Sequence, residues 1–235
     1  MAGAILPSEA DGQPRRWSRD HLRLHRLLRH RPTLLPPGAS LLLAVSGGQD
    51  SMAMAGLLLE LQHLHHWRLQ LWHGDHGWRD DSAHQARELE TWARDRQLPL
   101  SLDRQAPQSL GGNREQTARR WRYDRLMAQA LSLDCSHVLT AHTATDRAET
   151  VLLHLARGSH QRGLASLRVS QPLADVLGPR PGSQPPAGNQ GPLLVRPLQL
   201  FSREDTARIC RQQGWPVWCD PSNHDPVFRD RKSVV

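Results

Sequence analysis

The sequence has few of the residues that build disulfide frameworks and membrane spans. It holds three cysteines in 235 residues, Cys135, Cys210 and Cys219, which are widely spaced and form no C-x-x-C pair. We therefore expect neither a disulfide framework nor a cysteine zinc site, and a reduced, cytoplasmic setting fits best. No stretch approaches ~18 consecutive apolar residues, and the N-terminus lacks the apolar core of a signal peptide, so we predict no membrane span.

Lysine is almost absent as well, since Lys232 is the only lysine among 30 basic residues. The excess of arginine leaves a formal net charge of +7. Guanidinium groups bind phosphates in a bidentate geometry, so this charge favours a polyanionic partner such as RNA. A general preference for arginine, which would give only a solvated basic surface, explains the composition equally well.

The most informative stretch is an apolar run at 41–45 that ends in Ser46-Gly47-Gly48-Gln49-Asp50-Ser51. Five apolar residues without alternation predict a parallel strand that is buried on both faces. The two glycines permit positive φ and let backbone amides approach an anion closely. A helix over 52–66, capped by Asp50 or Ser51, would direct free amides and its dipole at the same place. We therefore predict a phosphate-binding loop.

This loop differs from the common P-loop, because it has no lysine and contains an aspartate. A carboxylate beside bound phosphates is explained by Mg²⁺, which typically takes one or two carboxylates together with phosphate oxygens and water. Asp50 is therefore a candidate magnesium ligand. The alternative is an ordinary glycine-rich turn between a strand and a helix, with Asp50 as its cap.

Strands and helices alternate along the rest of the chain. This spacing predicts an α/β fold with a Rossmann-like, doubly wound parallel sheet. The segment 171–192 is rich in proline and glycine, and we expect it to be a loop outside the compact core. The expected strands cover 67–72, 98–102, 136–140 and 193–195; the expected helices cover 80–97, 113–131 and 151–156, with others beginning at Ser18 and Ser202.

Further candidate residues lie after the strand at 136–140 and on the helix at 113–131. Asp146 and Glu149 are placed in the first turn of a helix, where they are either capping charges or a second magnesium carboxylate. Arg119 and Arg122 are three residues apart and share one helix face, where they could bind phosphates. A salt-bridged surface helix is the alternative explanation for these two arginines.

Seven motifs occur in an order and spacing that resembles the tRNA(Ile)-lysidine synthase family over about residues 38–231. The first motif alone resembles the pyrophosphate loop (PP-loop) of the ATP pyrophosphatase superfamily, whose members cleave ATP between the α and β phosphates. The motifs lie at 46–51, 73–79, 118–123, 139–150, 157–164, 196–198 and 220–223.

The resemblance implies a PP-loop domain, similar to adenine nucleotide alpha hydrolases, that attaches free L-lysine to the wobble cytidine of a tRNA(Ile) with a CAU anticodon. ATP would be consumed through an adenylated cytidine, with release of AMP and pyrophosphate. ATP would be bound by the loop 46–51 and His142, and Mg²⁺ by Asp50 and Asp146. Arg119 and Arg122 would act with the two aspartates in catalysis and steady the RNA or the adenylate.

The same resemblance divides the chain into three parts. Residues 1–37 would be an N-terminal extension with a short basic helix, 38–220 the PP-loop catalytic domain, and 221–235 the start of a C-terminal segment. The chain ends before the tRNA-binding segments that commonly follow in the family, which is expected of a fragment or of a divergent copy with weakened catalysis.

The chain departs from the family at Thr143 and Thr145, where members usually carry a second histidine and a second aspartate, and at Asp230, where they carry asparagine. Two other functions therefore stay open. One is a tRNA thiolase that uses the same adenylation; such enzymes usually need reactive cysteines or an iron–sulfur site. The other is a nucleotide-binding or tRNA-binding module without catalysis.

Overall fold

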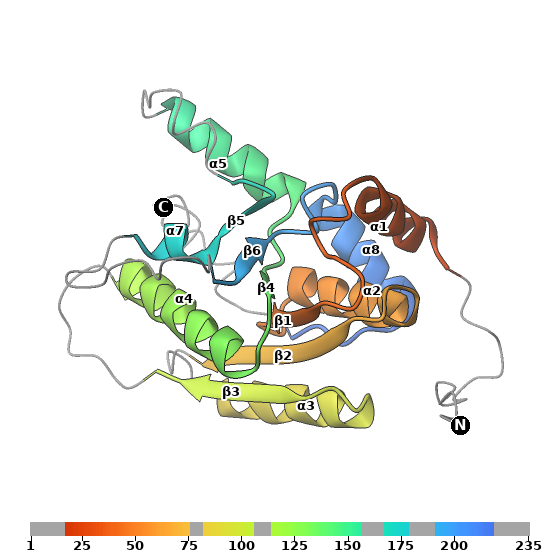
Figure 1. Cartoon of the computed structure of the whole chain (residues 1–235), viewed down its shortest axis with the longest axis horizontal. Helices are drawn as coiled ribbons and strands as arrows, with labels where there is room; N and C mark the ends of the chain where they lie inside the picture. The colour runs from red at the N-terminus through yellow and green to blue at the C-terminus, as the bar shows by residue number, and fades with distance from the viewer. Residues whose placement is uncertain (1–16, 76–81, 106–113, 157–166, 179–190, 219–235) are drawn as a thin grey trace.

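A six-stranded sheet with the order β3-β2-β1-β4-β6-β5 forms the centre of the computed structural model (Figure 1). The structure describes residues 17–75, 82–105, 114–156, 167–178 and 191–218. Neighbouring strands run parallel except for β5, which is antiparallel to β6. The predicted doubly wound parallel sheet is thus confirmed. The strands are β1 (Ser40–Ala44), β2 (Arg68–Asp75), β3 (Leu100–Arg104), β4 (His137–Leu139), β5 (Ser170–Pro172) and β6 (Leu193–Val195).

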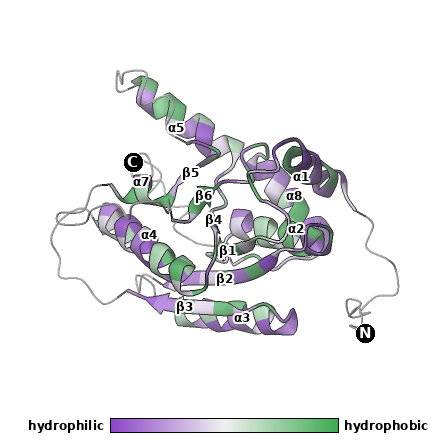
Figure 2. Ribbon diagram, viewed as in Figure 1, coloured by the Kyte–Doolittle hydropathy of each residue, from purple (hydrophilic) through white to green (hydrophobic). Residues whose placement is uncertain are grey.

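Helices cover both faces of this sheet. Figure 2 shows hydrophobic and hydrophilic residues side by side on the helix at 114–132, as on amphipathic helices with one buried face, whereas the helix at 49–65 is buried over most of its length. Within the described ranges, no helix is long and apolar enough to cross a membrane. The helices are α1 (Arg19–His30), α2 (Gln49–His65), α3 (Ser82–Asp95), α4 (Arg114–Ser132), α5 (Ala144–Ala156), α7 (Leu173–Leu177) and α8 (Arg203–Gln213).

Strand β1 contributes side chains to two hydrophobic cores, one on each face of the sheet. Leu41 and Leu43 pack into the core that also contains residues of α1, α2, α3 and α8, whereas Leu42 packs into the core shared with α4 and α7. Successive side chains of a strand point to opposite faces, and here each face is covered by helices. All three leucines have no exposed surface, so the prediction of a strand buried on both faces is confirmed.

Helix α2 begins at Gln49, three residues earlier than predicted, and its N-cap is Gly48. The prediction that Asp50 or Ser51 caps the helix was therefore wrong, because Gly48 has no side chain to cap the amides that follow it. Ser51 lies inside the first turn, where its hydroxyl donates to the carbonyl of Gly48 at 2.8 Å. The first amides of α2 therefore remain available to a ligand.

The segment 171–192 is not a loop from its beginning, as the sequence suggested. Its first residues complete β5 and form α7, and Leu173 is completely buried against the core with α4. Composition gave the wrong prediction here because one well-placed leucine is enough to dock a short helix. Residues 179–190, the C-terminal residues 219–235, and with them Cys219 and Asp230, lie outside the described part of the chain.

Two element boundaries also differ from the predictions. Strand β2 continues to Asp75, so His73 is part of the strand, where its Nδ1 lies 2.8 Å from the carbonyl oxygen of Val45. Helix α5 begins at Ala144, which puts Asp146 in its first turn and Glu149 one turn further along. Both differences extend elements towards the carboxyl end of the sheet.

Candidate active site

The sheet changes its winding direction between β1 and β4. Strands β2 and β3 lie to one side of β1, and β6 lies on the far side of β4. The chain segments that leave two such strands diverge, and ligands of open α/β sheets bind in the crevice at the strands' carboxyl ends. The glycine loop, defined as residues 46–51, follows β1, and the residues leading into α5 follow β4. Figure 1 shows the N-terminal ends of α5 and α8 near this edge.

Hydrogen bonds within the glycine loop fix its shape. The hydroxyls of Ser46 and Ser51 lie 3.2 Å apart, and the amide of Ser46 donates to the Ser51 hydroxyl at 3.2 Å. The amide of Gly48 donates to the Ser46 hydroxyl at 3.3 Å. Gly47 has φ +83°, in the left-handed region that other residues rarely occupy. The loop is therefore already shaped for an anion before any ligand binds.

A tryptophan from the segment after α8 packs directly on this loop. The amide of Trp218 donates to the carbonyl of Gly47 at 3.0 Å. A Cβ atom added to Gly47 would lie 2.8 Å from Cε3 of the Trp218 ring, closer than real Cβ contacts. Gly47 is thus required both for its backbone conformation and for the approach of the indole ring.

Asp50 joins the glycine loop to α8. Its carboxylate accepts a hydrogen bond from the hydroxyl of Thr206 at 2.5 Å. The side-chain amide of Gln49 donates to the same hydroxyl at 2.8 Å and to the carbonyl of Arg203 at 2.7 Å. Burial raises the pKa of Asp50, and the nearby charge of Asp146 raises it further, although the bond from Thr206 acts in the opposite direction.

Asp146 is held by its own helix turn and by Arg203. The amide and the hydroxyl of Thr143 both donate to one carboxylate oxygen at 2.7 Å, and Arg203 Nη2 donates to the other at 2.7 Å. Burial alone would raise the pKa of Asp146, but these Thr143 bonds and the Arg203 charge outweigh it and hold the pKa below its ordinary value. Arg203 also donates to Glu149 at 3.1 Å.

Thr143 and Thr145, which the sequence analysis singled out, have structural partners in the site. Thr143 is completely buried and provides the bonds to Asp146 just described. The hydroxyl of Thr145 accepts a hydrogen bond from the backbone amide of Arg203 at 3.2 Å. Both hydroxyls therefore help to fix the acidic side of the site, which consists of Asp50, Asp146 and Glu149.

His142 lies on the basic side of the same site. Its Nδ1 is 3.0 Å from the hydroxyl of Thr140. Burial lowers the pKa of His142 to about 4, and the positive charges of Arg196, Arg119 and Arg122 contribute to this shift. The imidazole is therefore neutral near pH 7, and it can donate or accept a hydrogen bond without adding a charge to the site.

Arg196 is a buried cation at the end of β6, with 1% of its surface exposed. Its Nη1 donates to the carbonyl of Arg168 at 2.7 Å, it also bonds the Tyr123 hydroxyl, and its Nε has no hydrogen-bond partner. Burial lowers its pKa. Among the described residues no carboxylate forms an ion pair with Arg196, so this positive charge is compensated only by dipoles. Such an environment favours an anion.

The predicted arginines of α4 border this basic side. The guanidinium of Arg119 lies 5.2 Å from the ring centroid of Tyr123, which is the contact range of a cation–π interaction. Arg119 and Arg122 both act on the charge of His142, so the face that they share on α4 is turned towards the site. The structure thus brings the predicted site residues to one edge of the sheet.

The donor set of the acidic side fits magnesium. Asp50 and Asp146 repel one another electrostatically, and a divalent cation between them would relieve this repulsion. The described residues contain no cluster of three or more metal-ligating side chains. Magnesium would therefore complete its coordination with phosphate oxygens and water, as it commonly does.

Sequence reasoning did not assign three residues of the site to it. Arg196 was noted only as part of the motif at 196–198, although it follows the apolar run of β6 at the same sheet edge as the glycine loop. Arg203 and Thr206 had no such signal, since they lie more than 150 residues from Asp50 in the sequence and meet it only through the packing of α8 on α2.

A doubly wound sheet with an anion-binding loop and paired carboxylates at its switch point defines a nucleotide-binding α/β protein. The chain belongs to the PP-loop domain family, whose model matches residues 19–234. The predicted PP-loop membership is therefore confirmed.

Similar proteins carry names that agree with this family. The chain is 51% identical over 212 residues to the tRNA(Ile)-lysidine synthase of Parasynechococcus marenigrum (strain WH8102), covering 90% of this chain and 59% of the relative. It is 41% identical over 223 residues to the tRNA(Ile)-lysidine synthase of a strain of Prochlorococcus marinus, covering 92% and 61%. The chain thus spans about 60% of the length of these curated relatives.

Solved structures with low sequence identity share the fold. The U34-tRNA thiolase NcsA from Methanococcus maripaludis, with its [4Fe-4S] cluster, gives a TM-score of 0.68 at 16% identity, covering 91% of this chain and 70% of that chain. NMN synthetase from Francisella tularensis gives a TM-score of 0.54 at 12% identity, covering 83% and 70%.

Proposed function

We propose that this chain is the catalytic domain of a tRNA(Ile)-lysidine synthase. It would use ATP to attach L-lysine to the wobble cytidine of a tRNA(Ile) with a CAU anticodon, in the cytoplasm where tRNA is modified. The curated relatives that carry this name support the proposal at 51% and 41% identity. Membership of the PP-loop family supports the use of ATP.

One observation carries the proposal, namely the division of the site into an acidic and a basic side around a single loop. The free amides of α2 and the glycine loop would bind the phosphates of ATP. Asp50 and Asp146 would hold Mg²⁺, whose charge would neutralise the negative charge that builds up on the phosphates during transfer. Arg119, Arg122 and His142 would steady the reacting phosphate or the RNA from the opposite side.

The reaction would proceed in two steps, which activate and then substitute the same ring carbon of the cytidine. In the first step, the carbonyl oxygen of the cytidine ring attacks the α phosphorus of ATP, and pyrophosphate leaves. In the second, the lysine ε-amine attacks the activated ring carbon and loses a proton, while AMP leaves with the former carbonyl oxygen. Fixed donors and charges around the α phosphate would lower the first barrier, an effect typically worth several kcal/mol.

The cysteines that the structure describes do not favour the alternative function, a tRNA thiolase. Burial raises the pKa of the Cys210 thiol to about 11, and burial also raises the pKa of Cys135. Both thiols are therefore protonated near pH 7 and are poor nucleophiles or sulfur carriers. An amine that arrives from solution needs no such residue.

The test is to replace Asp50 by asparagine and to measure Mg²⁺-dependent AMP release with a CAU-anticodon tRNA(Ile) transcript and L-lysine. We expect AMP formation to fall by at least about 100-fold, the usual cost of losing one group that stabilises transition-state charge. The matched control is Asp175→Asn on α7, where an exposed aspartate forms no side-chain hydrogen bond or ion pair with the described residues, so activity should be unchanged.

Mass spectrometry of the tRNA nucleosides identifies the product. Lysine-dependent modification of cytidine by the wild type is the expected result. A product that carries sulfur, or ATP binding without AMP release, would replace the proposal by one of the two alternative functions. Wild-type turnover by the Asp50 variant would remove this carboxylate from the mechanism.

A further inference from the structure

The outward side of α1 carries a row of arginines. Arg19, Arg23, Arg26 and Arg29 are separated by four, three and three residues, so they share one side of the helix, and all four are exposed. Asp20 is the only acid of α1, which gives the helix a net charge of +3 with histidines neutral. Among the described residues, Arg19, Arg26 and Arg29 form no side-chain hydrogen bond or ion pair.

Helix α3 serves as a comparison for α1, because it too carries exposed charged side chains. It carries Arg87 and Arg94 against Glu88, Glu90 and Asp95, which gives a net charge of −1. Arg94 pairs with Glu90 at 3.4 Å, and His84 lies 3.3 Å from Glu88. Arg87 forms no side-chain hydrogen bond or ion pair with the described residues, so an unpaired arginine also occurs on α3. What distinguishes α1 is the accumulation of four arginines against a single acid on one helix.

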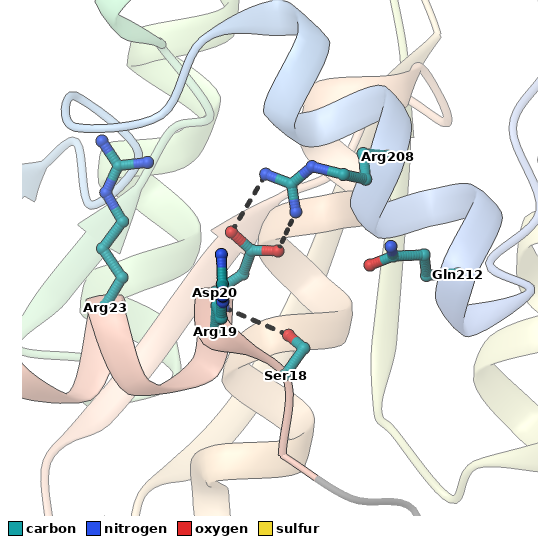
Figure 3. A pocket seen from close by; sticks show the side chains of 6 residues that line it. All are labelled: Ser18, Arg19, Asp20, Arg23, Arg208 and Gln212. Carbon is teal, nitrogen blue, oxygen red and sulfur yellow. Dashed lines mark hydrogen bonds and ion pairs between the residues drawn. The ribbon is translucent and has the colours of Figure 1, made fainter.

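A hollow of about 720 Å³ separates the N-terminal half of α1 from α8 (Figure 3). Arg19, Arg23 and Arg208 line it, together with Asp20, Ser18 and Gln212. Arg208 is occupied, because it bonds both carboxylate oxygens of Asp20, at 2.5 and 3.2 Å, and also Asp205 at 2.5 Å. Asp20, the acid that lines the hollow, is thus already paired with Arg208, and the guanidinium of Arg19 is left for a ligand.

The row of arginines reaches the candidate active site through Arg23. This side chain donates to Asp205 at 3.2 Å and to the carbonyl of Leu200, and its guanidinium stacks on Phe201 at 4.8 Å. Leu200 and Phe201, which Arg23 contacts, are followed closely by Arg203, which bonds Asp146 in the site. A chain of phosphates that leaves the site along this segment would next meet α1.

We propose that the outer side of α1, with Arg19, Arg26 and Arg29 as its free cations and the hollow beside α8, binds the phosphate backbone of the RNA substrate. The inference rests on the proposed function for the identity of the RNA. Exposed guanidinium groups without internal partners can exchange condensed counterions of a nucleic acid for phosphate contacts, and this exchange is favourable and depends on salt. Such contacts position the RNA and carry no sequence information.

The experiment compares two double variants that each remove two positive charges. Arg19→Gln with Arg26→Gln alters the α1 row, and Arg87→Gln with Arg94→Gln alters α3 as the matched control. Affinity for the tRNA transcript is measured over a range of salt concentrations. For the α1 variant we expect about tenfold weaker binding and a slope of log affinity against log salt that is smaller by roughly 1.4 to 1.8, the change for two lost phosphate contacts. For the α3 variant we expect neither change.

Kinetics separate this surface from the catalytic machinery. The α1 variant should raise the KM for tRNA and leave kcat unchanged, because none of its residues touches the reacting atoms. Equal losses in the α1 and α3 variants would mean that only overall charge matters and would overturn the inference. If the α1 variant instead lost binding to anionic lipid vesicles while its affinity for RNA stayed unchanged, the inference would also be overturned. The surface would then be assigned to lipid headgroups.

The two proposals fail in different ways. If wild-type protein forms lysidine and the α1 variant binds tRNA as the wild type does, the surface is wrong and the proposed function stands. If wild-type protein binds tRNA through α1 but makes no lysine-modified cytidine, the surface stands and the proposed function is wrong.

Discussion

Two arginines of the site have opposite surroundings. Arg203 lies between the carboxylates of Asp146 and Glu149, at 2.7 and 3.1 Å, whereas Arg196 is buried with a carbonyl and a phenol as its partners. The first neutralises negative charge before any cation binds. The second carries a positive charge that no carboxylate of the described residues compensates, and this charge adds to burial, the main cause of the low pKa of His142.

The low pKa of His142 makes stability depend on pH. Unfolded His142 binds a proton near its ordinary pKa of 6.5, while the folded chain binds it only near pH 4. The stabilisation is therefore complete above pH 6.5 and is lost as the pH falls from 6.5 towards 4. Between pH 7 and pH 5 the loss should be about 2 kcal/mol of unfolding free energy.

The measurement is urea unfolding at pH 7 and pH 5 for the wild type and for His142→Gln. Gln keeps a polar side chain but has no proton to gain, so the variant should lose about 2 kcal/mol less than the wild type over this range. His65 and His137, whose pKa values burial also lowers, are present in both proteins and cancel in the comparison. Identical pH dependence in both proteins would contradict the assignment of a neutral His142.

At the scale of elements, the contact between the glycine loop and the segment after α8 couples two distant parts of the chain. Trp218 packs on Gly47, and Trp215 packs on Gly56 of α2, where an added Cβ would lie 2.4 Å from the indole. Trp215 also meets Trp92 edge-on at 5.8 Å. The end of the described chain is therefore fitted onto α2 by two tryptophan–glycine contacts.

Replacing Gly47 by alanine should destabilise the protein and weaken ATP binding. The left-handed φ costs about 1 to 2 kcal/mol for any residue with a Cβ, and the close approach of Trp218 adds to that cost. Gly38→Ala is the matched control, because Gly38 has φ +76° and no atom within 4 Å of the added Cβ. Unfolding free energy and ATP affinity are the quantities to measure.

A double-mutant cycle with Trp218→Ala isolates the contact. If the clash contributes as the geometry indicates, Gly47→Ala should cost less in the Trp218→Ala background, and the remainder should match the cost of Gly38→Ala. Equal costs in both backgrounds would show that the indole ring yields freely and that only backbone conformation matters at Gly47.

The sequence predicted those elements whose signals are local. The strand at 41–45, the loop after it and the start of a helix at Ser18 are read from neighbouring residues, and in the structure Ser18 caps α1 through its hydroxyl. The edge strand β5 and α7 were missed, because three residues paired antiparallel to β6 and one buried leucine produce no periodicity. The partners of Asp50 were missed because α8 meets α2 only in the folded chain.

At the scale of the whole molecule, binding at the switch point should stabilise the entire fold, since β1 and β4 end at that edge and α2 and α8 begin there. ATP with Mg²⁺ at about 100 times its dissociation constant stabilises a protein by about 2.7 kcal/mol, which corresponds to a rise in Tm of roughly 5 to 11 °C for a domain of this size. We expect this rise in the wild type.

The control for the thermal shift is the Asp50→Asn variant, which should show little or no rise with ATP and Mg²⁺ because one carboxylate ligand is gone. Its Tm without ligand should remain close to that of the wild type, since asparagine can still accept the bond from Thr206. An equal shift in both proteins would mean that magnesium is held elsewhere.

The antiparallel strand β5 has a consequence for how the protein behaves at high concentration. An unpaired sheet edge offers free amides and carbonyls to the edge of another molecule, which is a route to aggregation. Here one edge is only three residues long and ends in Pro172, which has no amide hydrogen to donate. The opposite edge, β3, carries Asp103 and Arg104, and Asp103 is bonded by Arg125 at 2.6 Å. A short, proline-terminated strand and a charged strand thus protect the two edges of a sheet whose central strand β1 is buried and largely apolar.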